Sequence, residues 1–202
     1  MVFVELKFPV LGSSLPSDHG YAVYSCVSRL IPQVHEGDWL AIDTMPGTSR
    51  GDGVIVINER ARLRMRAPMD FVKLLMQLAG KRLDVDGHQV RLGIPQIFLL
   101  QPAGTLYARC VTIKKFTEPE PFLEAVKRKL EEMSVRGVPA VGPRRAFRVS
   151  NHTIVGFGLT VDGLSDEDSL LLQQRGLGGR RHMGCGFFVP IPSVRNSTGG
   201  GS

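Results

Sequence analysis

The sequence predicts an α+β protein made of two consecutive βαββαβ units, and three observations lead to that prediction. Stretches in which apolar and polar residues alternate, as in half-buried strands, are separated by segments with apolar residues at helical spacing. The order strand, helix, strand, strand, helix, strand occurs once before residues 102–104 and once after them. Gly, Pro, Asn and Asp mark the boundaries of these segments, as expected for turns.

The first half opens with an alternating stretch that is typical of a strand. Asp18 is expected to cap the first helix, and Pro32 is expected to end it. Asp86-Gly87 is a typical two-residue hairpin turn. The expected elements are, in order, a strand at 2–8, a helix at about 19–31, strands at 34–42 and 54–66, a helix from Pro68 to Gly80, a hairpin at 83–92 and a strand at 94–100.

The second half repeats this order. Phe122, Val126 and Leu130 have helical spacing and predict the buried face of an amphipathic helix. Ser165, followed three residues later by Asp168, forms a weak capping box that predicts the start of another helix. The expected elements are a strand at 106–116, a helix at 121–133, strands at 147–150 and 153–161, a helix after Ser165 and a strand at 186–191.

Two βαββαβ units in one chain make a tandem ferredoxin-like fold. The two halves share no visible sequence identity, so the prediction depends on repetition of the pattern. We expect an N-terminal domain at 1–101 and a C-terminal domain at 105–192, which carries a glycine-rich loop. The last residues, 193–202, end in STGGGS and are expected to form a flexible tail.

Composition favours a basic protein with a polyanionic partner. The 202 residues include 25 Lys and Arg against 19 Asp and Glu, which gives a net charge of +6. The three cysteines are far apart and contain no CxxC motif, which argues against a disulfide framework or a zinc site and fits a reducing, cytoplasmic compartment. No signal peptide and no apolar run of about 20 residues is present, so we expect no membrane segment.

Arginines occur at every second position within the strand expected at 54–66. A period of two places them on one face of a sheet, where four like charges repel unless a polyanion or acidic neighbours relieve them. The alternative is a solvated outer face. A second group of arginines lies in and before the strand expected at 147–150, and it could also be an ordinary exposed strand. The two groups are Arg60, Arg62, Arg64 and Arg66, and Arg144, Arg145 and Arg148.

A glycine-rich loop, QRGLGGRRHMGCGFF at residues 174–188, combines five glycines with cationic side chains. Successive backbone N–H groups in such loops can form anion-binding concavities. The loop follows a helix and precedes a strand, which is the reverse of the dinucleotide-binding order. It is therefore a candidate phosphate cradle, and the alternative is an exposed loop with incidental charge. The candidate binding residues are Arg175, Gly178, Gly179, Arg180, Arg181 and His182.

The glycine-rich loop resembles that of the repeat-associated RNA-binding (RAMP) superfamily of CRISPR systems. Within that superfamily, residues 15–38, LPSDHGYAVYSCVSRLIPQVHEGD, together with VTIKKF at 111–116, resemble the CRISPR repeat-cleaving endoribonucleases. The resemblance covers most of residues 1–192, and it is strongest to the compact form found with type I systems. It implies two ferredoxin-like domains side by side, in agreement with the pattern of elements.

The resemblance implies metal-independent cleavage of precursor CRISPR RNA within each repeat, without a cofactor. A ribose 2′-OH attacks the adjacent phosphate and leaves a 2′,3′-cyclic phosphate and a 5′-OH end. This chemistry needs a base, an acid and cations that stabilise the developing charge. The implied partners are CRISPR repeat RNA and guide RNA, together with other subunits of a type I effector complex.

Histidine suits both proton transfers because its unperturbed pKa lies near ~6.5. His19 at the start of the first helix and His35 just after that helix match positions where family members carry a catalytic histidine. Tyr21 and Tyr24 lie on the same helix and could orient or protonate the substrate. A helix-terminal histidine bonded to a loop is the alternative for His19, and a turn residue is the alternative for His35.

The remaining histidines are expected to have other roles. His182 is expected to bind phosphate or to pack within its loop, and His88 and His152 are expected at the surface. Some relatives use a lysine as a cationic helper, and no lysine lies near His35 in sequence. Arg29, Arg50 or an arginine from the second half would have to replace it.

Two alternatives to the nuclease hypothesis stay open. The protein could be a binding-only RAMP subunit that holds processed guide RNA in a surveillance complex. It could also be an unrelated ferredoxin-like protein whose glycine-rich loop binds a small phosphate-containing ligand. The nuclease hypothesis places RNA-backbone binding in the glycine-rich loop, and proton transfer on the first helix and the turn that follows it.

Overall fold

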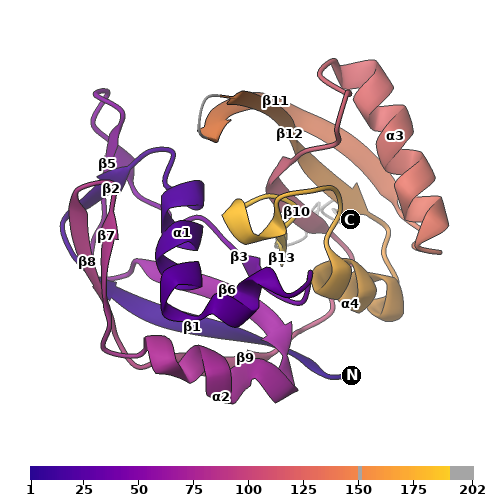
Figure 1. Cartoon of the computed structure of the whole chain (residues 1–202). Coiled ribbons are helices and arrows are strands. Elements are labelled where there is room, and N and C mark those ends of the chain that lie inside the picture. Colours follow the sequence, from indigo (N-terminus) through magenta and orange to yellow (C-terminus); the bar gives the residue numbers. More distant parts are fainter. Residues whose placement is uncertain (150–151, 192–202) are drawn as a thin grey trace, which may run out of the picture.

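The computed structural model describes residues 1–149 and 152–191, and it has the predicted α+β architecture. Figure 1 shows two halves side by side, with α1 (Gly20–Leu30) and the loop after α4 (Asp166–Arg175) between them. The expected tail at 193–202 lies outside the described residues. No helix in the described part of the chain is long and apolar enough to cross a membrane.

The main sheet of the first half is antiparallel and has β1 (Phe3–Leu11) in its middle. β1 pairs on one side with β6 (Arg62–Pro68) and on the other with β9 (Gln96–Leu99), and β3 (Ala41–Ile42) lies beyond β6. The first strand of the unit therefore lies between its third and fourth strands, as in a ferredoxin-like βαββαβ unit. The remaining elements are the hairpin β7 (Arg82–Val85) and β8 (His88–Leu92), and helical turns at Met69–Phe71, Val72–Leu75 (α2) and Met76–Leu78.

The second half repeats the arrangement with a four-stranded antiparallel sheet. Its order, β11-β12-β10-β13, again places the first strand of the unit between the third and the fourth. The Ser165 side chain accepts a hydrogen bond from the Asp168 N–H, so the predicted cap of α4 is confirmed. The elements are β10 (Leu106–Val111), α3 (Pro119–Glu132), β11 (Val138–Val149), β12 (His152–Asp162), α4 and β13 (Phe188–Pro190).

Each half has its own apolar core. Side chains of the first sheet, such as Leu6 and Leu63, pack with Val27 of α1. Phe122 of α3 packs against Phe157 of β12 in the second half, with ring centroids 4.7 Å apart. These separate clusters support the division into domains at 1–101 and 105–192, which we retain as a proposal.

The strand predicted at 34–42 is wrong over most of its length. Pro32–His35 forms a 3-10 helix, closed by hydrogen bonds from the Val34 N–H to the Ile31 carbonyl and from the Glu36 N–H to the Gln33 carbonyl. Only Ala41–Ile42 pairs as a strand. Because proline fixes φ near a helical value, the chain turns at this point instead of extending.

The single strand predicted at 54–66 is also wrong. β5 (Val54–Val56) belongs to a separate three-stranded sheet with β2 (Ser14–Pro16) and β4 (Thr48–Ser49), and only β6 joins the main sheet. Between β5 and β6 the Asn58 side chain accepts a hydrogen bond from the Arg60 N–H. Such a local side-chain bond stabilises a turn at the expense of an extended strand.

Two further expectations fail, one because of a contact between distant segments and one because of strand geometry. Asp18 does not cap α1, because its carboxylate accepts a hydrogen bond from the Arg148 N–H, 2.7 Å away on β11. β11 begins at Val138, well before the strand predicted at 147–150, although its sequence contains two prolines. An edge strand tolerates proline, and a register shift between Val141 and Arg144 accommodates the second one.

Candidate active site and nucleic-acid interface

The glycine-rich loop of the second half docks against the first half. The Gly184 N–H donates a 3.0 Å hydrogen bond to the Ile42 carbonyl of β3. At the start of α1, Gly20 lies against the loop so closely that a Cβ at this position would overlap the Met183 carbonyl oxygen. Glycine is therefore required for this approach of backbone to backbone. As a result, a segment near the end of the chain lies beside the first helix (Figure 1).

This docking assembles three side chains from separate segments. The Tyr24 hydroxyl of α1 lies 2.8 Å from His35 Nδ1, at the end of the 3-10 helix. The ring of His182, in the glycine-rich loop, packs against the Tyr24 ring, with a centroid distance of 4.1 Å and an interplanar angle of 35°. Two imidazoles and one phenol hydroxyl, all groups able to donate or accept protons, therefore lie close together.

The surroundings favour the neutral form of His182. Burial lowers the pKa of His182, the nearby Asp38 carboxylate opposes that effect, and His35, Arg181 and Arg180 lower the pKa further. Partial desolvation, followed by the neighbouring Tyr21, raises the pKa of Tyr24. His182 is therefore suited to accept a proton, while Tyr24 keeps its own and can donate a hydrogen bond.

Cations and backbone surround the His182 imidazole. A hollow of about 360 Å³ lies beside it. Arg181 is largely used to hold the loop, since its guanidinium donates to the Gln174 carbonyl at 2.7 Å and to the Asp38 carbonyl at 3.2 Å. Its Nε is buried without a hydrogen-bond partner among the described residues. The hollow is lined by Asp38, Arg175, Gly178, Gly179, Arg180, Arg181 and His182.

The structure separates the two histidines that the sequence left as alternatives. His19 is 1% exposed, and its Nδ1 lies 2.8 Å from the Pro16 carbonyl oxygen. Its Nε2 accepts a hydrogen bond from the Met45 N–H. Both ring nitrogens are thus bonded to backbone, which favours the alternative of a helix-terminal histidine bonded to a loop, and a catalytic role for His19 remains a prediction. Tyr21 is 41% exposed on α1.

The predicted arginine ladder is divided among unlike environments. Arg66 is 1% exposed, forms an ion pair with Glu5 at 2.8 Å and donates to the Phe188 carbonyl of β13. The Phe187 ring lies 4.1 Å from its guanidinium. Arg66 therefore connects the two halves, and its expected contact with phosphate is corrected.

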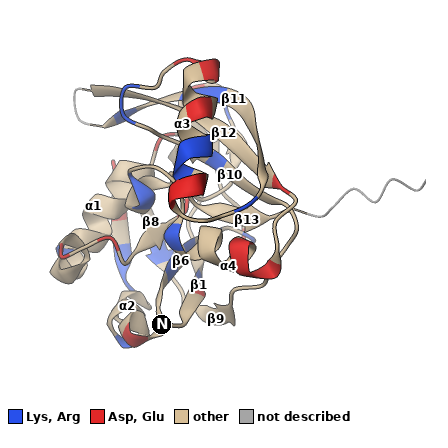
Figure 2. Cartoon of the chain, turned by 90° about the vertical axis from the view of Figure 1, so that its right-hand side faces the viewer, with Lys and Arg blue, Asp and Glu red and all other residues tan. Residues whose placement is uncertain are grey.

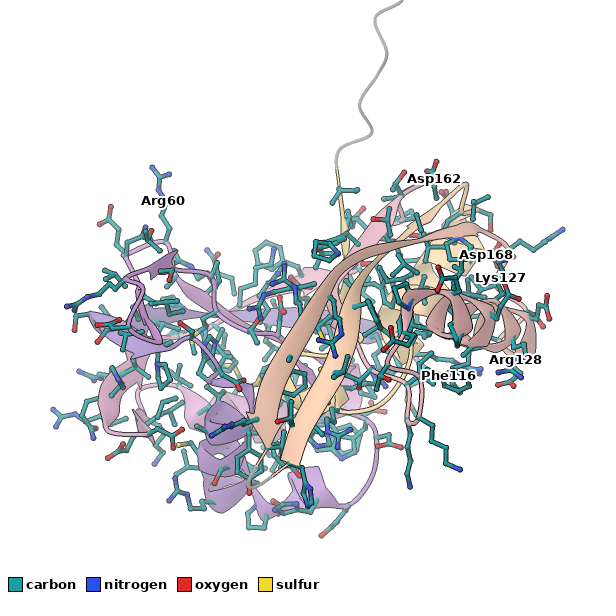
Figure 3. All side chains as sticks on the ribbon, turned by 90° about the horizontal axis from the view of Figure 1, so that it is seen from above. Arg60, Phe116, Lys127, Arg128, Asp162 and Asp168 are labelled. Atoms are coloured by element: carbon teal, nitrogen blue, oxygen red, sulfur yellow. The ribbon has the colours of Figure 1, made fainter. Side chains whose placement is uncertain are left out.

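The other three members of the ladder have different partners. Arg64 forms an ion pair with Asp43, and Arg62 donates to two backbone carbonyls near its own strand. Arg60 lies in the turn before β6, and Figure 3 shows it at the opposite end of the molecule from α3. The prediction of four arginines on one face is wrong for Arg60 alone, since the other three alternate along β6. Acidic neighbours, one of the two expected ways to relieve the repulsion, pair with Arg64 and Arg66.

The arginines of β11 lie along the hairpin that it forms with β12 (Figure 2). Arg144 and Arg148 are exposed, and Arg145 donates to the Arg109 carbonyl at 2.9 Å. Arg109 lines two cavities between the halves, and it is not among the binding residues predicted from the sequence. The alternation in the strand predicted at 106–116 places Arg109 at an outward position, and this pattern could have indicated an exposed cation.

Asp38 is not among the site residues predicted from the sequence. It belongs to the site because its carbonyl accepts a hydrogen bond from Arg181 and its carboxylate lies near His182. No pattern in the sequence indicates either contact. Within residues 1–149 and 152–191, no group of three or more His, Cys, Asp or Glu side chains is arranged to hold a metal ion.

The fold is that of a tandem ferredoxin-like protein. A family model described as "Cas6 Crispr" matches residues 4–193. A curated protein of Myxococcus xanthus (strain DK1622), named CRISPR-associated endonuclease Cas6, is 40% identical over 190 residues, which are 94% of this chain and 82% of that protein. This chain belongs to the Cas6 family.

Solved structures share the fold at low sequence identity. A structure described as "CRISPR associated protein Cas6" matches with a TM-score of 0.69 at 14% identity, over 95% of this chain and 99% of that one. A Thermus thermophilus Cse3 bound to an RNA that represents a pre-cleavage complex matches with a TM-score of 0.56 at 15% identity, over 95% and 100% of the two chains. These similarities show that the tandem arrangement is shared.

Proposed function

We propose that this protein is an endoribonuclease that binds CRISPR repeat RNA and cleaves precursor CRISPR RNA into guide RNAs. The observation that carries the proposal is the cluster of His35, Tyr24 and His182 beside the basic glycine-rich loop. The name of the Myxococcus relative and the family membership support the substrate class.

The cluster supplies the groups that cleavage by the ribose 2′-OH requires. His182, favoured in its neutral form, takes the proton of the 2′-OH, and the 2′-oxygen bonds to phosphorus. His35 acts as an imidazolium whose Nδ1–H donates to the Tyr24 hydroxyl oxygen, and its other ring nitrogen gives its proton to the departing 5′-oxygen as the bond from that oxygen to phosphorus breaks. Arg180 stabilises the negative charge on the phosphorane. The products are a 2′,3′-cyclic phosphate and a 5′-OH end, and the steps need no metal ion.

The decisive experiment uses a labelled native repeat in excess EDTA. We expect one cut and a cyclic-phosphate end. His35→Ala should bind the repeat with unchanged Kd and fail to cut it, whereas His88→Gln, in the β7–β8 hairpin, should cut normally. Cleavage that requires added Mg²⁺ would contradict metal independence. Tight binding with the RNA left intact would identify a binding-only subunit.

We propose that RNA binding uses exposed and half-exposed cations of the second half. Arg144, Arg145 and Arg148 of β11, with Arg175 and Arg180 near the loop, are the phosphate contacts that we retain. Affinity should fall steeply with salt because each neutralised phosphate releases counterions, and Arg180→Ala should lower the slope of log K against log salt by about 1. An affinity that does not change with salt would contradict these contacts.

We also propose that the protein stays on its product as part of a type I effector complex. No contact in this structure bears on the other subunits, and the proposal follows from the family resemblance. Purification from cells that express the whole set of CRISPR proteins, followed by RNA extraction, tests it. Guide RNA and other subunits should purify with the protein, and its recovery alone would contradict the proposal.

A further inference from the structure

A second hollow lies on the far side of the glycine-rich loop from Tyr24. It has a volume of about 530 Å³ and runs between α3, the turn that follows β10, and the loop. We refer to it as the α3 groove. The residues that matter for its chemistry are Lys114, Phe116, Arg128, Lys129, Gly179 and Arg180.

The α3 groove is strongly cationic. Four of its lining side chains are basic, and the single acidic one is Glu132. Lys115 in the adjoining turn adds another exposed cation, and it has a φ of 75°, a conformation that is costly for residues other than glycine. Such a concentration of positive charge attracts phosphate groups.

The groove also has an aromatic wall. Phe116 is half-buried, with part of its ring packed against the core of the second half. The Arg128 guanidinium lies 5.8 Å from its ring centroid, and Figure 3 shows the two side chains next to each other. A partly exposed aromatic ring beside an arginine is a typical platform for an unpaired nucleic-acid base.

The α3 groove and the proposed active site share a boundary. Gly178, Gly179 and Arg180 line both the groove and the hollow that contains His182. The Gly179 position is open, since a Cβ there would meet only Thr112 Oγ1, at 4.0 Å. A chain of phosphates can therefore pass from one hollow to the other over this part of the loop.

We propose that the α3 groove binds a single-stranded nucleotide that flanks the cleaved phosphodiester, with its base on Phe116 and its phosphate among Lys114, Arg128 and Arg180. The occupant is part of the RNA substrate because the groove continues into the active-site hollow. Its base is unpaired because only an unpaired base can stack on the Phe116 ring. The position of this nucleotide next to the cut depends on the function proposed above, whereas the binding of a nucleotide in the groove does not.

The test measures fluorescence anisotropy with repeat RNA that carries a 2′-deoxy sugar at the cut, so that no cleavage occurs. One RNA extends past the cut on both sides, and two others are shortened on one side or the other. Phe116→Leu, which keeps an apolar side chain for the core, and Arg128→Ala should each weaken binding of the long RNA about tenfold. Neither substitution should change the affinity for the shortened RNA that lacks the nucleotide proposed to lie in the groove.

Lys127→Ala is the matched control. Lys127 belongs to the same helix, forms an ion pair with Glu124 at 2.8 Å and does not line the groove. Its variant should bind every RNA as the unchanged protein does. An equal loss for Lys127→Ala and Arg128→Ala, or equal losses for long and shortened RNAs, would overturn the α3 groove as a nucleotide site.

Two more outcomes separate this inference from the proposed function. If the unmodified repeat is cleaved but Phe116→Leu and Arg128→Ala bind the long RNA normally, the groove proposal alone fails. If they lose affinity for the long RNA only, while no cleavage is detected, the groove stands and the nuclease proposal fails. Binding of a free mononucleotide as tight as that of the long RNA would show a small-ligand site and overturn the proposal.

Discussion

The two ends of α1 carry the same residue type in opposite environments. At the first end, His19 is buried and both ring nitrogens are bonded to backbone groups of neighbouring segments. Just beyond the other end, His35 is exposed and bonded to Tyr24. The difference teaches that a histidine's chemical role depends on which segments fold over it. The segment around Met45 covers His19, and the glycine-rich loop brings His182 and cations to Tyr24, the partner of His35.

The arginines teach the same lesson. Arg66 and Arg180 both appeared as phosphate contacts in the sequence. Arg66 is enclosed by Glu5 and by the backbone of β13, so that its charge joins the two halves. Arg180 stays half-exposed, where two hollows meet.

The largest expected effect is at the exposed end of α1. His35→Ala should reduce the single-turnover cleavage rate by about 10²–10⁴-fold because a proton-transfer group is lost. Its free energy of unfolding should change by less than about 0.5 kcal/mol, since surface substitutions have small effects. Rapid-quench kinetics and urea unfolding measure the two quantities. A rate within threefold of the unchanged protein would remove His35 from the mechanism.

The buried end should respond in the opposite way. His19→Ala should lower the free energy of unfolding by about 2–4 kcal/mol, because the Pro16 carbonyl and the Met45 N–H lose their partners and a cavity remains. The cleavage rate per folded molecule should stay nearly unchanged. Urea unfolding followed by circular dichroism gives the first value. If His19→Ala stopped cleavage without loss of stability, the assignment of the two ends would be reversed.

Tyr24→Phe sharpens the comparison further. It removes the hydroxyl that bonds to His35 but keeps the ring against His182, so we expect a loss of about tenfold in rate with little change in RNA affinity. Tyr21→Phe, on the exposed part of the same helix, is the control and should cleave at the normal rate. Equal losses of cleavage rate in Tyr24→Phe and Tyr21→Phe would show that the hydrogen bond between Tyr24 and His35 does not contribute to cleavage.

The smallest expected effect concerns pH. Burial lowers the pKa of His19, and it also lowers that of His182, so the unfolded chain binds protons more readily than the folded one. The stability that their neutral forms contribute is present above about pH 6.5 and is lost as the pH falls through the folded pKa. Each histidine contributes a slope of less than about 1.4 kcal/mol per pH unit.

Unfolding free energies measured between pH 7.5 and 5 test this expectation. His19→Ala should show a flatter acid dependence than the unchanged protein, because one of the two shifted groups is gone. A steeper dependence in the variant would show that His19 is charged in the folded state.

Local patterns predicted much of the fold. The alternating strands, the Asp86-Gly87 turn and the Ser165 cap all occur as expected, because each depends on residues close together in sequence. The strands predicted at 34–42 and 54–66 are wrong for local reasons too. A turn that begins at Pro32 interrupts the first and a side-chain hydrogen bond of Asn58 interrupts the second, although the strand-like residue pattern continues through both stretches. Propensity alone does not decide which of two local preferences prevails.

The candidate site was less predictable than the fold. The sequence indicated Tyr24, His35 and His182 separately, and it assigned the last to phosphate binding or packing. Their association depends on the approach of Met183 to Gly20 and on the Gly184 bond to β3, contacts between residues distant in the chain.

By itself, the sequence determined the class of elements, their order in two units, the basic character of the chain and the resemblance to CRISPR repeat-cleaving proteins. Only the tertiary structure decided which of the two histidines is exposed and which arginine is buried. The physical reason is that strands and turns arise from interactions between near neighbours. Burial and hydrogen-bond partners of a polar side chain arise instead from segments that meet only when the two halves pack together.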